Sequence, residues 1–135
     1  MIVQTVEHVQ QNIKRISAIL KELIVLSKAL DLLDDMDFSS DSEEEEVKAL
    51  ITVSKNEAKL RLQFYTEMEK LFKLGGIVRD LDSGILEFKV RHKQREVIVC
   101  YQYGESDLSG WYEEGERFVD KRPLRELDHQ FEKKD

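Results

Sequence analysis

Residues 68–91 read MEKLFKLGGIVRDLDSGILEFKVR, and the spacing of apolar residues changes within this stretch. Before the two glycines, apolar residues recur every three or four positions, which is typical of an amphipathic helix. After them apolar and charged residues alternate, with Leu86, Phe88 and Val90 on one side of an expected strand. Paired glycines preceded by lysines also form a common helix C-terminus. The stretch therefore predicts that a helical half ends near residue 74 and that a β-sheet follows.

The N-terminal half is predicted to form two long antiparallel helices. An apolar stripe at helical spacing begins at Val6 and predicts a first helix over 5–34, with Thr5 as its N-cap. An acidic loop follows over 35–42. A second helix is expected over 43–74, where Ser42 and Glu45 fit a capping box. Each helix would be about 30 residues, or about 45 Å, long. Joined by a short polar loop, the two helices should pair as a hairpin.

The C-terminal half is predicted to form a small antiparallel sheet. Expected strands cover 77–81, 85–91 and 96–103, with turns at 82–84 and 92–95, and a short fourth strand at Trp111 and Tyr112. The third strand is apolar on both faces and should lie in the interior of the sheet. Pro123 opens a possible short helix with Leu124, Leu127 and Phe131 on one face.

The expected fold class is α+β in one domain over 1–135. A long antiparallel helical hairpin is followed by a three- to four-stranded antiparallel sheet over 75–124. A C-terminal segment, 125–135, contains the short helix. The length of 135 residues fits one domain.

The charge distribution argues against nucleic acid as the main partner. The formal net charge is -7, but nine acidic residues and no base lie between Asp31 and Glu46, leaving 19 acids and 21 bases elsewhere. A nucleic-acid-binding protein is expected to show a basic excess. One cysteine gives no internal disulfide, and no apolar run approaches the roughly 20 residues of a membrane span. We expect a soluble, cytoplasmic protein without a membrane partner.

The width of the apolar stripes predicts self-association. An isolated hairpin of this length cannot cover both stripes, and a small sheet reaches only part of them. A homodimer in which two hairpins form a four-helix bundle would bury the remainder.

The C-terminal half also carries an ordered series of short motifs. They are Gly76-Ile77-Val78-Arg79-Asp80-Leu81, Gly84-Ile85-Leu86-Glu87-Phe88, Val97-Ile98-Val99-Cys100-Tyr101, Gly104-Glu105, Trp111-Tyr112, Phe118 and Arg122-Pro123-Leu124. In order, spacing and residue type, this series over 75–124 resembles the uncharacterised prokaryotic family named domain of unknown function 2203. The resemblance implies helices followed by a sheet and no established activity. Tyr101 and Tyr112 stand where that family tends to have tryptophan and histidine.

One cluster is a candidate small-molecule site, located in and after the loop that follows the third strand. Its members are Glu105, Asp107, Trp111, Tyr112 and Arg122. Aromatic rings beside carboxylates and an arginine could bind a small polar ligand or support acid–base hydrolysis. The alternative is structural, with Trp111 packed on the sheet and Arg122 paired with Glu105.

A second candidate is a weak RNA-binding surface at the tip of the hairpin. Lys89, Arg91, Lys93 and Arg95 crowd this tip, and neighbouring tyrosines could stack on bases. The alternative is that these basic residues guard an exposed hairpin.

The remaining residue types indicate no metal, cofactor or catalytic residue. His8, His92 and His129 are far apart in sequence and lack the spacing of zinc ligands. Cys100 lies among apolar residues, as a buried structural thiol would. No glycine-rich phosphate loop or dinucleotide-binding fingerprint is present. The three functional hypotheses are therefore an interaction or scaffold protein, a ligand-binding or hydrolytic protein, and an RNA-binding module.

Overall fold

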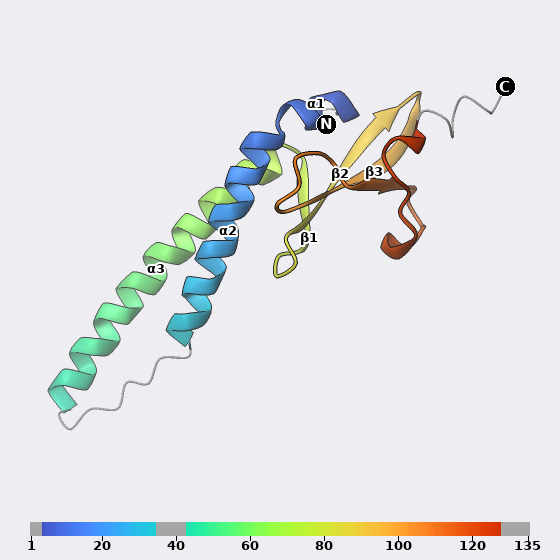
Figure 1. Cartoon of the computed structure of the whole chain (residues 1–135). Coiled ribbons are helices and arrows are strands. Elements are labelled where there is room, and N and C mark those ends of the chain that lie inside the picture. Colours follow the sequence, from blue (N-terminus) through green and yellow to red (C-terminus); the bar gives the residue numbers. More distant parts are fainter. Residues whose placement is uncertain (1–3, 35–42, 128–135) are drawn as a thin grey trace.

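The structure is a computed structural model that describes residues 4–34 and 43–127 (Figure 1). Its elements are α1 (Val6–Gln11), α2 (Ile13–Asp34), α3 (Glu43–Lys73), β1 (Gly76–Asp80), β2 (Ile85–His92), β3 (Arg95–Gln102), β4 (Gly110–Tyr112) and the 3-10 helix η1 (Phe118–Asp120). Helices followed by an antiparallel sheet confirm the predicted α+β class. The predicted acidic loop, the Ser42 cap and the chain after residue 127, including Phe131 and His129, lie outside the described residues.

The first predicted helix, over 5–34, is wrong in one respect, because the chain leaves the helical conformation at Asn12. Thr5 caps α1 as expected, since its hydroxyl oxygen accepts a hydrogen bond from the His8 N–H at 3.1 Å. At Asn12 ψ is 7°, and the side-chain amide donates to the His8 carbonyl at 2.9 Å. Such side-chain bonds compete with the helix backbone and end it without proline or glycine. The resulting α2 has 22 residues against 31 in α3, so the expected equal lengths are not found.

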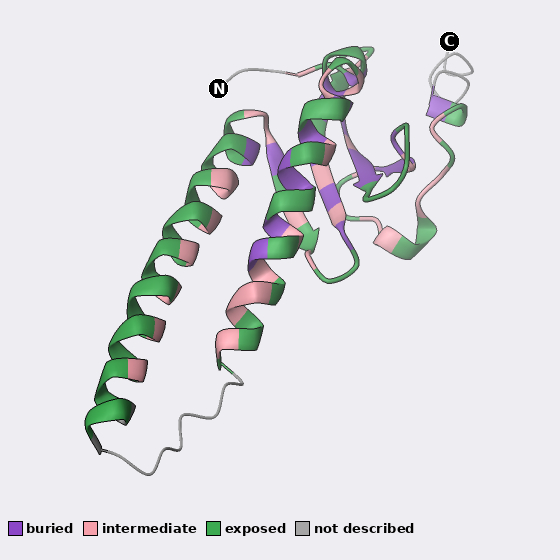
Figure 2. Ribbon diagram, turned by 60° about the vertical axis from the view of Figure 1, so that its left-hand side comes forward, coloured by how far each residue is buried: buried purple, intermediate pink, exposed green. Residues whose placement is uncertain are grey.

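Helices α2 and α3 form an arm that extends away from the sheet. They lie side by side and run in opposite directions (Figure 1). Burial is confined to the end of the arm near the sheet (Figure 2). The buried residues of α2 end at Leu26, and Leu71 is the one buried residue among the α3 side chains that the structure describes.

The four strands form one antiparallel sheet in the order β1-β2-β3-β4. β2 and β3 pair over their full length and are joined by Lys93 and Gln94. The φ angles of these two residues, 48° and 67°, are those of a two-residue hairpin turn. The predicted turn at 92–95 and the interior position of the third strand are confirmed.

The two edges of the sheet are built differently. In β1 the register against β2 shifts between Val78 and Asp80, which marks a bulge. In β4, Trp111 forms an additional antiparallel bridge with Arg122. Arg122, from the segment that follows η1, thus covers part of the β4 edge.

One face of the sheet makes the hydrophobic core with the helices. Twelve side chains in this core are at most 2% exposed: Val9, Ile16, Leu20, Leu23, Leu71, Leu86, Phe88, Val90, Val97, Val99, Tyr101 and Trp111. Since burying one large apolar side chain contributes roughly 1.5–3 kcal/mol, this layer is the main source of stability. The turn of the chain at Asn12 brings Val9 onto this layer, because α1 packs against β2.

The glycine that ends α3 has a testable role. Gly75 has a φ of 84°, and a Cβ there would overlap with Nε2 of Gln4, which donates a 2.8 Å hydrogen bond to the Leu74 carbonyl. Gly104 has a similar φ of 95° with open space around it. We expect Gly104→Ala to lower the free energy of unfolding by about 1 kcal/mol through backbone strain alone. Gly75→Ala should cost about 1 kcal/mol more, because the Gln4 hydrogen bond is also lost. Urea denaturation of both variants measures the difference, and equal losses would contradict the role of Gln4.

Candidate functional site

The predicted small-molecule cluster is divided by the structure into a buried and an exposed part. Trp111 and Tyr112 are buried in β4, whereas Glu105 and Asp107 are exposed in the preceding loop. Trp111 and Arg122 do come together. Their backbones exchange two hydrogen bonds of 2.9 and 2.8 Å, and the guanidinium carbon of Arg122 lies 4.6 Å from the centre of the Trp111 ring system.

The partner of Arg122 is Glu116. Both terminal nitrogens of the guanidinium donate to the Glu116 carboxylate, at 2.9 and 2.7 Å. The expectation that Arg122 pairs with Glu105 is wrong, because the turn at residues 113–116 returns Glu116 to the guanidinium instead. The Glu113 N–H also donates to this carboxylate at 2.9 Å. That backbone hydrogen bond, followed by the Arg122 bond, holds the pKa of Glu116 below its usual value.

This arrangement favours a structural role for the cluster. Both oxygens of Glu116 and both terminal nitrogens of Arg122 are already paired with each other. One face of the Trp111 ring is covered by the same guanidinium. A charged ligand at this point would have to displace the bidentate ion pair between Arg122 and Glu116. Arg122 is therefore not preformed to bind an anion, and the ligand-binding or hydrolase hypothesis stays a prediction.

The basic hairpin is partly neutralised by the same acidic turn. Lys89 lies 3.5 Å from Glu114, and Arg95 lies 3.0 Å from Glu113. Arg91 is exposed, and its backbone N–H donates to the Gln4 carbonyl at 2.8 Å. Lys93 occupies the tip of the turn. Two of the four basic residues thus fix residues 113–116 against the sheet, and RNA binding by the hairpin stays a prediction.

A small second cluster lies on the face of the sheet opposite the core, and the sequence reasoning missed it. Phe118 of η1 packs edge-to-face on Tyr112, with ring centres 6.3 Å apart. The Phe118 ring also contacts two cations, Arg79 at 4.4 Å and Lys121 at 4.2 Å. The segment that contains η1 folds back over the sheet and brings Phe118 to Arg79. The sequence gives no signal for this contact, because the two residues are far apart along the chain.

Cys100 is buried, as expected for a structural thiol. Burial raises its pKa to about 12, the negative charge of Glu87 adds to the increase, and Lys121 and Arg79 oppose it. A thiol of this kind is a poor nucleophile at neutral pH. Across residues 4–34 and 43–127, no group of three or more His, Cys, Asp and Glu side chains could hold a metal ion.

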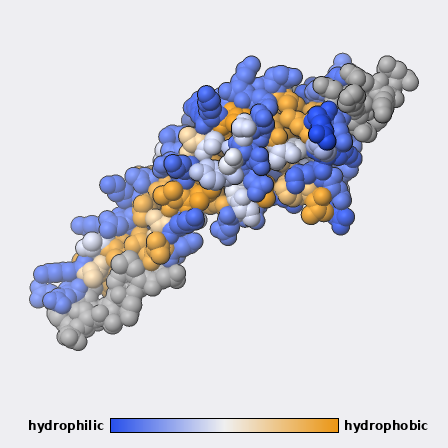
Figure 3. All heavy atoms as spheres, viewed as in Figure 1, coloured by the Kyte–Doolittle hydropathy of each residue, from blue (hydrophilic) through white to orange (hydrophobic). Residues whose placement is uncertain are grey.

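The exposed apolar residues of α3 form the most extended candidate surface. Four of them share one face of the helix at steps of three and four residues, with Ser54 and Ala58 in the intervening positions, and we call this row the α3 seam: Val47, Ile51, Leu62 and Tyr65. These four side chains are between 49% and 69% exposed. A seam with this repeat is typical of helices that pack against other helices. Figure 3 shows apolar side chains along the length of the arm.

The model of the family described as "Uncharacterized conserved protein (DUF2203)" matches residues 3–124, which extends the resemblance from the sheet to the helices. No curated protein and no solved structure matches. None of the helices in the described ranges combines the length and apolar character needed to cross a membrane.

The ion pair of Arg122 predicts an acid-sensitive contribution to stability. Because the pKa of Glu116 is lowered in the folded state, its stabilising contribution is present at neutral pH and is lost as the pH falls through that lowered pKa. We expect Glu116→Gln to be less stable than the wild type at pH 7, and the difference to shrink below the ordinary glutamate pKa of about 4.3. Urea unfolding followed by Trp111 fluorescence measures both. Glu105→Gln is the matched control, and an equal loss in that variant would mean that Arg122 is not specific for Glu116.

The raised pKa of Cys100 predicts a protected thiol. In the native state its reaction with a disulfide reagent at pH 8 should be on the order of a thousandfold slower than in the unfolded chain, because the thiolate fraction is that much smaller. Stopped-flow absorbance in buffer and in concentrated urea gives the two rates. A native rate within tenfold of the unfolded rate would contradict the burial.

Proposed function

We propose that this chain, which belongs to the DUF2203 family of uncharacterized conserved proteins, is a non-enzymatic interaction protein that works as a homodimer. In this proposal α2 and α3 act as one helical hairpin, and two hairpins pack as a four-helix bundle. The observation that carries the proposal is the α3 seam, a row of exposed apolar side chains on one face of the helix.

The arm needs a partner because its own sheet is too short to cover it. Phe64 and Met68 of α3 pack against the core, but Val47 and Ile51 lie several helical turns further from the sheet. In α2, Leu30 and Leu33 beyond the core are only half-buried. Isolated exposed apolar residues are common on protein surfaces, whereas several of them on one face of a helix mark an interaction site.

A second copy of the same chain fits this surface by its charge distribution. The first turns of α3 carry the acidic Glu44 and Glu45, and its last turn carries the basic Lys70 and Lys73. Two α3 helices packed antiparallel about a two-fold axis place the acidic end of each beside the basic end of the other. The apolar seams then face each other along the centre, while the charges favour this orientation over a parallel one.

Charge substitution in the α3 seam tests the dimer. We expect the wild type to have the mass of a dimer at micromolar concentration, and Leu62→Glu to have the mass of a monomer. The glutamate would place one charge from each copy in a desolvated apolar seam, where it has no partner. Size-exclusion chromatography with multi-angle light scattering measures the mass.

The matched control is Val119→Glu, which alters an exposed apolar residue on η1, outside the arm; Val119 is 73% exposed. It should leave the mass of the dimer unchanged. Circular dichroism and the Trp111 emission maximum confirm that each protomer stays folded. A monomeric wild type, or a dimer that persists in Leu62→Glu, would refute the proposal.

A further inference from the structure

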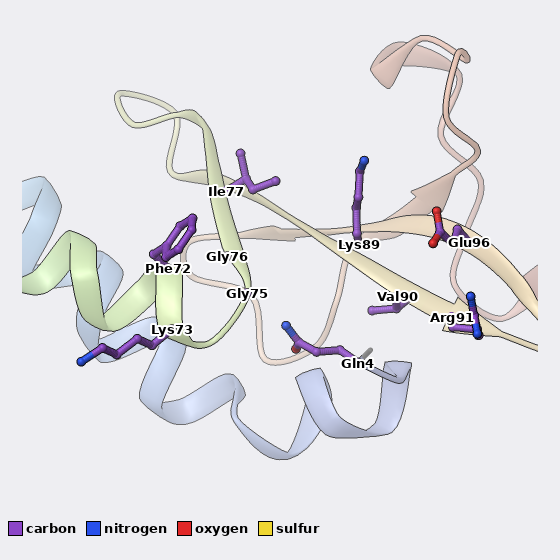
Figure 4. A pocket seen from close by; sticks show the side chains of 10 residues that line it. All are labelled: Gln4, Phe72, Lys73, Gly75, Gly76, Ile77, Lys89, Val90, Arg91 and Glu96. Atoms are coloured by element: carbon purple, nitrogen blue, oxygen red, sulfur yellow. The ribbon is translucent and has the colours of Figure 1, made fainter. Parts of the chain in front are cut away.

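A pocket of about 440 Å³ opens where the end of α3, strands β1 and β2, and the chain near Gln4 meet (Figure 4). Its volume falls within the range of roughly 300–1,000 Å³ that is usual for small-molecule sites. It is separate from both sequence-predicted clusters, apart from two basic residues of the hairpin that line it, Lys89 and Arg91.

The backbone at this point is held in position by specific contacts. The Gln4 side chain donates to the Leu74 carbonyl, and the Gln4 carbonyl accepts a hydrogen bond from the Arg91 N–H. Gly75, which also lines the pocket, permits this approach because a side chain there would overlap with Gln4. Gln4 is therefore hydrogen-bonded both to the end of α3 and to β2. These two bonds hold the walls of the pocket together without a ligand.

The walls combine exposed apolar surface with positive charge. Phe72 is 76% exposed and Ile77 is 50% exposed, although both line a concave site. Figure 4 shows that Phe72, Ile77 and Lys89 rise on the same side of the strands. An apolar surface of this kind inside a pocket, beside a few charged groups, is typical of sites that bind the body of a small ligand.

The charge of the pocket is opposite to that of the chain. Lys73, Lys89 and Arg91 line it with a single acid, Glu96, in a protein whose formal net charge is -7. Lys73 pairs with Glu69 and points away from the pocket in Figure 4. Lys89 has a contact of 3.5 Å with Glu114. Arg91 is exposed and lies opposite Glu96 in the β2–β3 register. Among residues 4–34 and 43–127 no salt bridge joins its guanidinium to Glu96 or to another carboxylate, so it has donors available for an anion.

We infer that this pocket binds a small carboxylate with an apolar body, with the carboxylate at Arg91 and the body against Phe72 and Ile77. The charge complementarity selects an acid over a neutral compound of the same shape, and the exposed aromatic ring favours a flat ligand. A guanidinium can donate two parallel hydrogen bonds to a carboxylate, which a lysine cannot.

Titration with 2-naphthoate and with its neutral isostere 2-naphthamide tests the inference. Amide chemical shifts in nitrogen-15 spectra locate the site and give both dissociation constants. We expect 2-naphthoate to shift the amides of Gly75, Gly76 and Ile77 and to bind about tenfold more tightly than the amide. Arg91→Gln should remove this preference while keeping the backbone hydrogen bond to Gln4. Ile77→Ser should weaken both compounds equally, because it removes only apolar contact.

Arg117→Gln is the matched control, since Arg117 pairs with Asp120 on η1 and does not line the pocket. It should bind 2-naphthoate like the wild type. Absence of binding, shifts at other residues, equal affinities for the two compounds, or an unchanged preference in Arg91→Gln would each overturn the inference. The substituted residues Ile77, Arg91 and Arg117 lie outside α3, whereas the dimer test alters Leu62 within it, so failure of one proposal is distinguishable from failure of the other.

Discussion

The structure depends on a difference in length between its two layers. A strand of eight residues such as β2 spans about 26 Å, whereas the 31 residues of α3 span about 46 Å. The sheet therefore packs on one end of the helices, where Leu20, Leu23 and Leu71 belong to the same buried core as the strand residues. The remainder of the arm can bury its apolar residues only helix against helix. Protein surfaces of this kind, continuous with the core at one end and open at the other, are well suited to association.

The sequence pattern predicts the sheet more accurately than the helices. The predicted strand boundaries agree with the observed ones to within one residue, because the alternation after Gly76 is regular and each turn carries a clear signal. The interruption at Asn12 was missed, because one side-chain hydrogen bond outweighed an uninterrupted apolar stripe. The wide stripes indicated that some apolar surface would stay open, but only the packing shows which residues of α3 turn inward and which form the seam.

The candidate site shows the same division between local pattern and distant contact. That Trp111 would be buried and that Arg122 would pair with a glutamate were both among the alternatives considered. The identity of the glutamate was not predictable, because Glu105 and Glu116 are both within reach in sequence and the turn at 113–116 decides between them. The pocket beside Arg91 was also beyond the sequence reasoning, since Gln4, Phe72 and Arg91 belong to three separate segments.

The bridge between Trp111 and Arg122 also affects how the sheet presents itself to other molecules. An open strand edge is a template for pairing with strands of other chains, which leads to aggregation. One lateral boundary of this sheet is blunted by that bridge. The other, β1, is short, bulged between Val78 and Asp80, and carries the charged Arg79. Both boundaries thus disfavour growth of the sheet by addition of further strands, so crowding of many copies should favour contact through helices over fibre-like stacking.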